Sequence, residues 1–184
     1  RWFELHPRWR TADGGSGTVE PVGTVELSDP AGRLPFPAVS AGTTYPGAAI
    51  PVAAQVRAGR LLTGADLDPE SFRRLPDGSF WVGDEFGPWL LHFDAGGRLL
   101  EPPIGLPGIR SPEHPEAAVR GATLRGSRGL EGLALAPDGR TLWAMLEGTV
   151  AGDPDGTLRI YEFDTRTRTF ARDASTGEPR FRRY

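Results

Sequence analysis

Apolar and polar residues alternate over short stretches of this chain, and turn-forming residues separate the stretches. Thr18–Leu27 alternates in this way, and Ser79–Gly83 and Arg140–Leu146 are short and rich in aromatic and branched side chains, so all three predict strands. Ala53–Leu62 is consistent with another strand, whereas Arg33–Ile50, with its prolines and glycines, is typical of a loop. The pattern therefore predicts a protein of short strands in which helix is confined to brief turns.

One motif occurs twice between Glu70 and Asp164. Each copy contains a glutamate, a Pro-Asp-Gly turn, a tryptophan, a second glutamate and a Phe-Asp pair. The first copy contains Glu70, Asp77, Trp81, Glu85 and Phe93-Asp94; the second contains Glu131, Asp138, Trp143, Glu147 and Phe163-Asp164. The copies are offset by 61 residues at the first two positions, by 62 at the next two and by 70 at the last. Since Pro presets φ while Asp and Gly tolerate positive φ, each copy predicts strand, tight turn, strand, loop and strand.

Antiparallel units that repeat in this way are typical of β-propeller blades, whose usual spacing is about 40–50 residues. We assign the excess length to loop, mainly Gly105–Ser127, with a helical turn around Glu113–Val119. An ordinary sandwich containing two similar hairpins is the alternative. In a propeller, Trp81 and Trp143 are expected at matching places in adjacent blades, packed between sheets.

The predicted class is all-β: a β-propeller present as a partial set of blades. Residues 61–127 are assigned to the first clear blade plus a long loop, and residues 128–184 to the second clear blade. Residues 1–60 form an N-terminal part whose pattern assigns no clear element order, and a third blade could lie there. A propeller needs at least about four blades to close. Because the chain also lacks an initiator Met, we expect it to be a fragment, with the remaining blades outside it.

Composition narrows the possible classes of function. Gly 25 and Pro 18 favour many turns, while five Trp and nine Phe supply apolar area for a folded core. The absence of Cys excludes disulfides, thiolate catalysis and thiolate metal sites. A net charge of -3 gives no general attraction to nucleic acid, and no apolar run reaches the ~18 residues of a membrane span.

Three motifs in this region resemble the family named for the esterase-like activity of phytase. They are Asp66–Ser71, Leu75–Pro88 and Arg128–Leu135, in that order, and the similarity spans roughly residues 60–170. The resemblance implies a secreted or periplasmic bacterial β-propeller. It also implies a small-molecule phosphoester or ester substrate, hydrolysed with the help of calcium.

Carboxylates are concentrated near these motifs, where residues 66–85 contain Asp66, Asp68, Glu70, Asp84 and Glu85. Equivalent positions of successive blades converge on a propeller's central channel, so Glu70, Glu85 and Glu131 are expected to face a common space. Converging acids without lysine partners repel one another, and Ca²⁺, which takes six to eight oxygen ligands, relieves this repulsion. The predicted calcium ligands are therefore Asp68, Glu70, Asp84, Glu85 and Glu131.

The leading functional hypothesis is metal-assisted hydrolysis of a phosphoester or ester. Glu70 or Glu131 would take a proton from water, and Arg128 would neutralise the substrate. The alternative is a non-catalytic propeller that serves as a binding or scaffold module and holds a structural cation. Both readings need the same ring of acids, so the sequence leaves them open.

Several of these residues also have a simpler structural interpretation. Asp68-Pro69-Glu70-Ser71 could begin a helix, with Asp68 as the N-cap. Asp77 and Asp138 are expected to be turn residues, and His92 to be structural. Arg73, Arg74 and Arg128 could hold phosphate, but surface ion pairs are the simpler reading. Asp153 and Asp155 resemble an exposed loop, and neither Ser40 nor Ser127 lies in a Gly-x-Ser-x-Gly motif.

Overall fold

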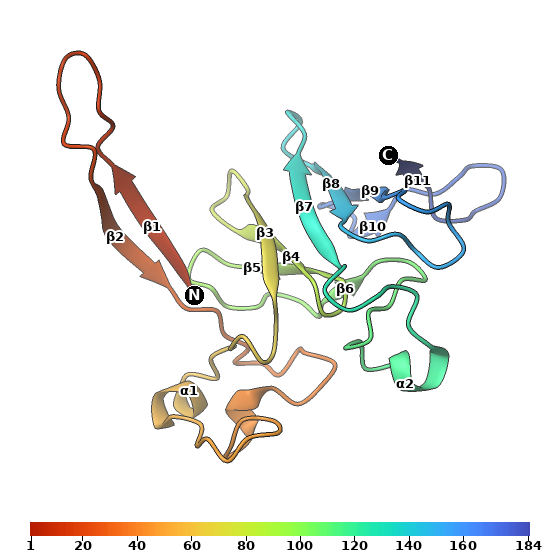
Figure 1. Cartoon of the computed structure of the whole chain (residues 1–184), viewed down its shortest axis with the longest axis horizontal. Helices are drawn as coiled ribbons and strands as arrows, with labels where there is room; N and C mark the ends of the chain where they lie inside the picture. The colour runs from red at the N-terminus through yellow and green to blue at the C-terminus, as the bar shows by residue number, and fades with distance from the viewer.

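The computed structural model describes all 184 residues and is dominated by strands (Figure 1). Its helices are short: the 3₁₀ turn η1 (Val39–Ala41), α1 (Ala54–Ala58) and α2 (Ala117–Arg120). The prediction of an all-β chain with few helices is confirmed. The strand predicted over Ala53–Leu62 is wrong: α1 lies there, built mainly of Ala, Gln and Arg, which favour helix.

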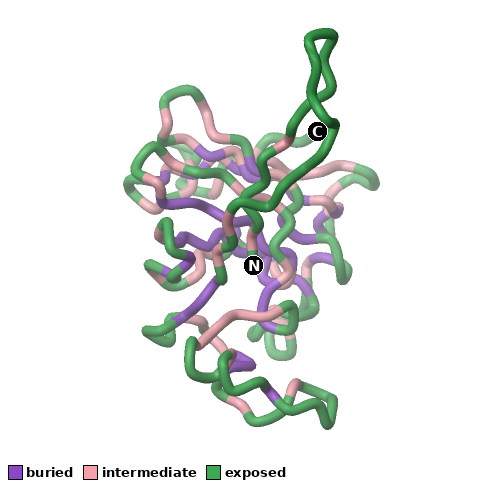
Figure 2. The backbone as a smooth tube through the Cα atoms, turned by 90° about the vertical axis from the view of Figure 1, so that its left-hand side faces the viewer, coloured by how far each residue is buried: buried purple, intermediate pink, exposed green.

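The N-terminal strands form an arm that extends away from the rest of the molecule (Figures 1 and 2). β1 (Trp2–Pro7) and β2 (Val19–Val25) pair antiparallel in a two-stranded sheet, so the strand predicted around Thr18–Leu27 is confirmed. Most of the arm is exposed, but Trp2 packs edge-on against Phe72 and Phe80, with ring centroids 4.5 and 5.5 Å away. These contacts anchor the base of the arm.

Two larger antiparallel sheets form the body of the molecule. The first sheet has the order β3 (Pro69–Arg74), β4 (Phe80–Asp84), β5 (Trp89–Phe93) and β6 (Ile104–Gly105). The second contains β7 (Leu130–Leu135), β8 (Thr141–Leu146), β9 (Arg159–Asp164), β10 (Thr169–Phe170) and β11 (Phe181–Arg183), and both β10 and β11 pair with β9. Because Pro69–Arg74 is a strand, the helix that could have begun at Asp68 is excluded.

The strand register reproduces the sequence repeat. In the first sheet Trp81 lies between Arg73 and His92; in the second, Trp143 lies between Ala134 and Glu162. The pairs Phe80–Phe93 and Leu142–Phe163 correspond in the same way. Both sheets also have a register shift near the start of their first strand, between Pro69 and Ser71 and between Leu130 and Gly132. The internal repeat is therefore structural.

The core explains why the two central strands differ in burial. Trp81 and Leu90 face the second sheet and pack with Leu142, Leu146 and Tyr161 in one cluster. The opposite face of the first sheet packs with N-terminal residues in a second cluster that contains Leu27, Leu67, Phe80, Val82 and Leu91. Every residue of β4 and β5 is buried, whereas burial alternates along β8. The first sheet is thus covered on both faces.

Trp81 and Trp143 occupy matching positions in their sheets but differ in environment. Trp81 is fully buried, and the guanidinium of Arg168 lies 5.3 Å from its ring centre. Trp143 is half-buried, with Arg182 at 5.1 Å, because no further sheet covers that face of β8. The two tryptophans therefore occupy matching positions, as expected, but only Trp81 is packed between two sheets. The chain forms several separate antiparallel sheets and no closed ring or barrel.

Candidate metal centre

Two β-bulges place glutamates where the two sheets meet. Glu70 lies at the register shift between Pro69 and Ser71, and Glu131 lies at the equivalent shift between Leu130 and Gly132. A bulge adds an unpaired residue and re-aims its side chain away from the regular alternation of the strand. The repeated bulge therefore sets the direction of both glutamates.

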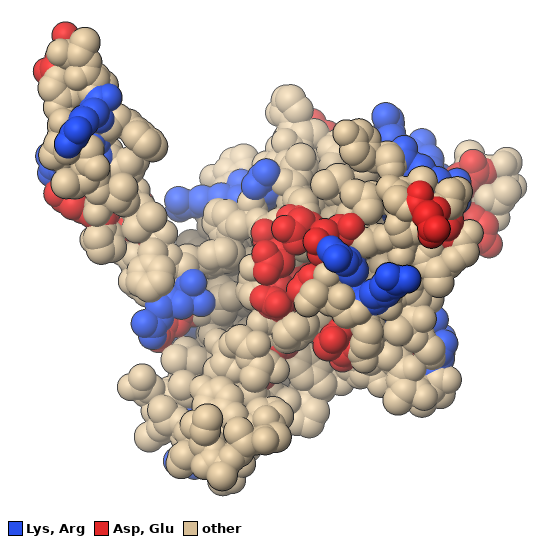
Figure 3. Space-filling view, viewed as in Figure 1, with Lys and Arg blue, Asp and Glu red and all other residues tan.

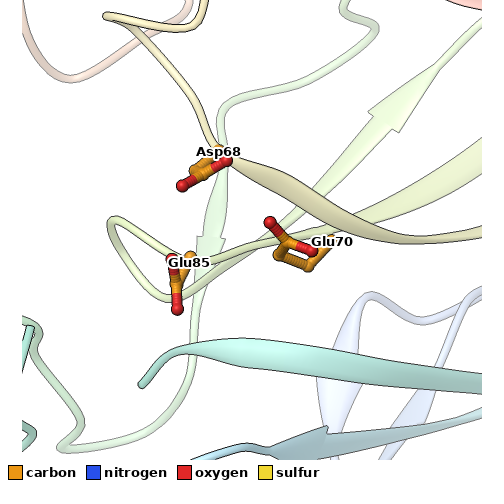
Figure 4. Close-up of side chains that lie close together, drawn as sticks. All are labelled: Asp68, Glu70 and Glu85. Atoms are coloured by element: carbon orange, nitrogen blue, oxygen red, sulfur yellow. The ribbon is translucent and has the colours of Figure 1, made fainter. Parts of the chain in front are cut away.

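Five carboxylates form an acidic cluster at this junction: Asp68, Glu70, Glu85, Glu131 and Glu147. Oxygen atoms of Asp68, Glu70 and Glu85 lie within 4.8 Å of one another, and so do oxygen atoms of Glu85, Glu131 and Glu147. Glu85 belongs to both triplets and links the two sheets. Figure 4 shows Asp68 at the start of β3 and Glu85 on the β4–β5 turn, with Glu70 beside them on β3. In Figure 3 acidic side chains gather where β3 and β7 approach each other, with basic side chains alongside.

A close backbone contact makes this convergence possible. A Cβ atom on Gly129 would lie 2.2 Å from the carbonyl oxygen of Glu85 and 2.6 Å from its Cα. Gly129 also accepts a hydrogen bond from the amide of Glu147 at 2.9 Å. The missing side chain thus allows the segment before β7 to approach Glu85, and the same residue holds Glu147 in place.

Burial and mutual repulsion perturb the titration of the cluster. Burial raises the pKa of Glu70, and the negative charges of Asp68 and Glu131 raise it further. Burial also raises the pKa of Glu85, followed by the charges of Asp68 and Glu147. Both shifts have the direction expected when acids are crowded together without a cation. A bound cation would reverse the effect by favouring the ionised forms.

Asp84 is adjacent to the cluster in sequence but is not one of its converging carboxylates. It is completely buried, and its two oxygens accept hydrogen bonds from the amides of Asp68 at 2.8 Å and Gly87 at 3.0 Å. Burial raises the pKa of Asp84 to about 7, although both hydrogen bonds act in the opposite direction. The carboxylate of Asp84 is therefore directed at backbone rather than at the shared space.

A cavity of about 790 Å³ lies beside the cluster, between the loops that precede β7 and follow β8. Arg125, Arg128 and Glu147 contribute to its wall. Arg128 forms an ion pair with Glu147 at 2.5 Å, so it lies between the acids and the cavity. The surface ion pair expected as the simpler reading of Arg128 is present, and the same position also suits contact with an anionic substrate.

The structure thus brings together most of the residues predicted from the sequence. Asp68, Glu70, Glu85 and Glu131 converge, and Arg128 adjoins them; Asp84 is separate. Glu147 was not among the predicted site residues, although its offset of 62 residues from Glu85 in the repeat was the signal that could have identified it. The donor set consists only of carboxylate oxygens, which suits a hard cation such as Ca²⁺.

Ser79, His92 and Glu101 form a second polar cluster, at the first sheet. Their contacts follow the order hydroxyl, imidazole, carboxylate that is found in a catalytic triad. His92 Nε2 lies 3.1 Å from Ser79 Oγ, and Nδ1 lies 2.8 Å from Glu101 Oε1. The Ser79 hydroxyl, however, donates to Asp77 at 2.7 Å. Arg168, in the turn between β9 and β10 of the second sheet, forms an ion pair with Glu101 at 2.6 Å. These contacts from Asp77 through Ser79, His92 and Glu101 to Arg168 therefore connect the two sheets, in keeping with the structural role expected for His92.

The remaining aspartates have the following roles. Asp77 and Asp138 accept hydrogen bonds from backbone amides two or three residues later, which confirms them as turn residues. Asp153 and Asp155 lie in an exposed loop, as expected, and Asp155 is itself exposed, but the side chain of Asp153 is only 3% exposed. It pairs with Arg159 at 2.5 Å and with Arg183 at 3.0 Å, which compensates for its burial.

Comparison with known proteins establishes the family. The family described as "Phytase-like: Esterase-like activity of phytase" matches residues 1–178. The chain belongs to this family. It is also 28% identical over 196 residues to an uncharacterized secreted protein of Arthroderma benhamiae, an alignment that covers 89% of this chain and 36% of that relative. The chain therefore spans about a third of that relative's length.

No solved structure matches the chain. None of its helices has the length and apolar character required to cross a membrane.

Proposed function

We propose that this phytase-like chain contributes a calcium site for the hydrolysis of a phosphoester or ester. The observation that carries the proposal is the position of Glu85, which is shared by two carboxylate triplets drawn from both sheets. The match to the phytase-like family over residues 1–178 supports a hydrolase-type function. Asp68, Glu70, Glu85 and Glu131, together with Glu147, would hold the ion.

The roles of the protein's own side chains follow from their positions. Calcium bound here would supply Lewis acidity that polarises a phosphoryl or carbonyl oxygen. Glu70, whose carboxylate lies within one of the two triplets, would take a proton from an attacking water. Glu131, at the equivalent bulge, is the second candidate base. Arg128, at the wall of the cavity, would orient an anionic group of the substrate.

We further propose that the two sheets are neighbouring blades of a β-propeller completed by blades outside this chain. Their matching registers and bulges support this, because neighbouring blades of a propeller are related by rotation about its axis. In such an arrangement each blade packs one face against the next blade, as the Trp81 face of the first sheet packs against the second sheet. The half-buried face around Trp143 is then where the next blade would pack. The alignment covers only 36% of the secreted relative, which is consistent with this arrangement, and the relative's description supports a secreted location.

Ion binding and hydrolysis can be tested separately. Calcium binding to the 184-residue chain is measured by calorimetry and by terbium luminescence, for wild type, Glu85→Gln and Glu20→Gln. Glu20→Gln removes the same charge from the exposed arm and serves as the matched control. We expect Glu85→Gln to weaken binding by more than about tenfold, since it removes the shared ligand, and the control to bind like wild type. Equal binding by all three proteins would contradict the site.

Hydrolysis of p-nitrophenyl phosphate and p-nitrophenyl acetate, with calcium and with chelator, tests the catalytic part. Calcium-dependent turnover that falls in Glu70→Gln and Glu131→Gln supports it. Calcium binding without turnover of either substrate would favour the alternative, a binding or scaffold module with a structural cation.

A further inference from the structure

The buried carboxylate of Asp84 holds two separate segments of the acidic cluster together. One oxygen accepts the amide of Asp68 at the start of β3, and the other accepts the amide of Gly87 in the turn after β4. The amide of Glu85 donates to the carbonyl of Asp68 at 2.9 Å, which adds a second tie between the same segments. The backbone that carries Asp68 and Glu85 is therefore fixed from within the protein.

The second sheet shows that the fold itself does not need an acid at this position. Pro69 pairs with Asp84 as Leu130 pairs with Leu146, so Leu146 is the equivalent residue. Leu146 is also completely buried and belongs to the main apolar cluster. An apolar side chain thus ends this strand in one sheet and a carboxylate ends it in the other. Burying a carboxylate is unfavourable unless its hydrogen bonds compensate, so the presence of Asp84 calls for a reason beyond packing.

We propose that Asp84 is a positioning residue for the acidic cluster, holding the start of β3 against the β4–β5 turn so that Asp68 and Glu85 face the same space. This role rests on the proposed function. It differs from that of a ligand, because Asp84 is fully buried, belongs to neither carboxylate triplet and directs both oxygens at backbone amides. Residues that orient ligands commonly change metal affinity when they are replaced, even though they do not touch the ion.

The first test is calcium affinity in folded variants. Asp84→Asn keeps the size of the side chain but can accept only one of the two amides, so we expect calcium affinity to fall by about 10–100-fold. Asp29→Asn is the matched control: Asp29 is also buried and accepts two amides, from Arg33 and Leu34, but none from the residues of the cluster. We expect the control to lose stability and to retain its affinity for calcium. Unchanged affinity in folded Asp84→Asn would overturn the positioning role.

A double-mutant cycle distinguishes positioning from direct ligation. If Asp84 acts by placing Glu85, then adding Asp84→Asn to Glu85→Gln lowers affinity by much less than the product of the two separate effects. Fully additive losses would identify Asp84 as an independent ligand and overturn the inference. If wild type binds calcium and only the Asp84 tests fail, the proposed site survives without this role; if wild type binds none, both fail.

A measurement on the wild-type protein covers the case in which Asp84→Asn does not fold. Amide hydrogen exchange at Asp68, Glu85 and Gly87 is followed with calcium and with chelator. Positioning by Asp84 predicts that these amides are already protected without the ion. Protection that arises only when calcium is added would show that the ion organises the segments, and would overturn the inference.

Discussion

The two sheets share a strand register, a bulge and a Pro-Asp-Gly turn, yet their environments and chemistry differ. The first sheet has Asp84, His92 and a buried Trp81 where the second has Leu146, Glu162 and a half-buried Trp143. The shared features are backbone requirements: a tight turn, an extra residue at the bulge and apolar side chains facing inward. The differing features concern what lies next to each sheet.

This comparison separates the framework from the site. Both bulges present a glutamate, but only the first sheet has a buried carboxylate behind its bulge. The second sheet contributes Glu131 and Glu147, and it covers one face of the first. The acidic cluster is therefore a property of the pair of sheets, and neither sheet has the complete set of carboxylates.

The tryptophans should give the largest difference between the sheets. Trp81→Ala removes a fully buried side chain from the main core and is expected to lower the free energy of unfolding by about 3–5 kcal/mol. Trp143→Ala removes a half-buried side chain and should cost clearly less. Urea denaturation of the two variants measures both values. Equal losses would show that the outer face of the second sheet is as well packed as the inner face.

The buried acid should give the first sheet a distinctive dependence on pH. The pKa of Asp84 is raised from 3.8 to about 7 on folding, so between these values the folded chain holds a proton that the unfolded chain has lost. Stability from this group is therefore present at low pH and is lost as pH rises through that window, by at most about 1.4 kcal/mol per pH unit. Groups that do not contact Asp84, such as His92, whose pKa is lowered chiefly by burial, are expected to titrate alike in wild type and Asp84→Asn.

Denaturation of wild type and Asp84→Asn in chelator at several pH values between 4 and 7 isolates this contribution. The difference in unfolding free energy, wild type minus variant, should decrease steadily as pH rises. A constant difference would contradict a raised pKa for Asp84.

The junction between the sheets should be sensitive to one added methyl group. Gly129→Ala places a Cβ against the backbone of Glu85, at 2.2 Å from its carbonyl oxygen, so the sheets must shift apart. We expect a loss of about 1–3 kcal/mol in unfolding free energy, together with weaker calcium binding. Gly64→Ala is the control, since no atom lies within 4 Å of its added Cβ. Similar stability and calcium affinity in both variants would mean that the junction is not tightly packed.

The sequence by itself determined the repeat and most of the strands within it. Local rules suffice for this: Pro-Asp-Gly specifies a turn, alternation specifies a half-buried strand, and the offset between copies aligns Glu70 with Glu131 and Glu85 with Glu147. The same rules failed at Ala53–Leu62, where good helix formers lay in a short stretch that also suits a strand.

Only the tertiary structure decided which acids meet and which do not. Asp84 and Glu85 are neighbours in sequence, yet successive strand positions point to opposite faces, and the turn after β4 directs Glu85 towards the second sheet while Asp84 stays buried. Glu147 joins the cluster because Gly129 lets the two sheets approach closely. Such contacts depend on how the sheets pack, and packing depends on pairs of residues far apart in the chain, which no local pattern records.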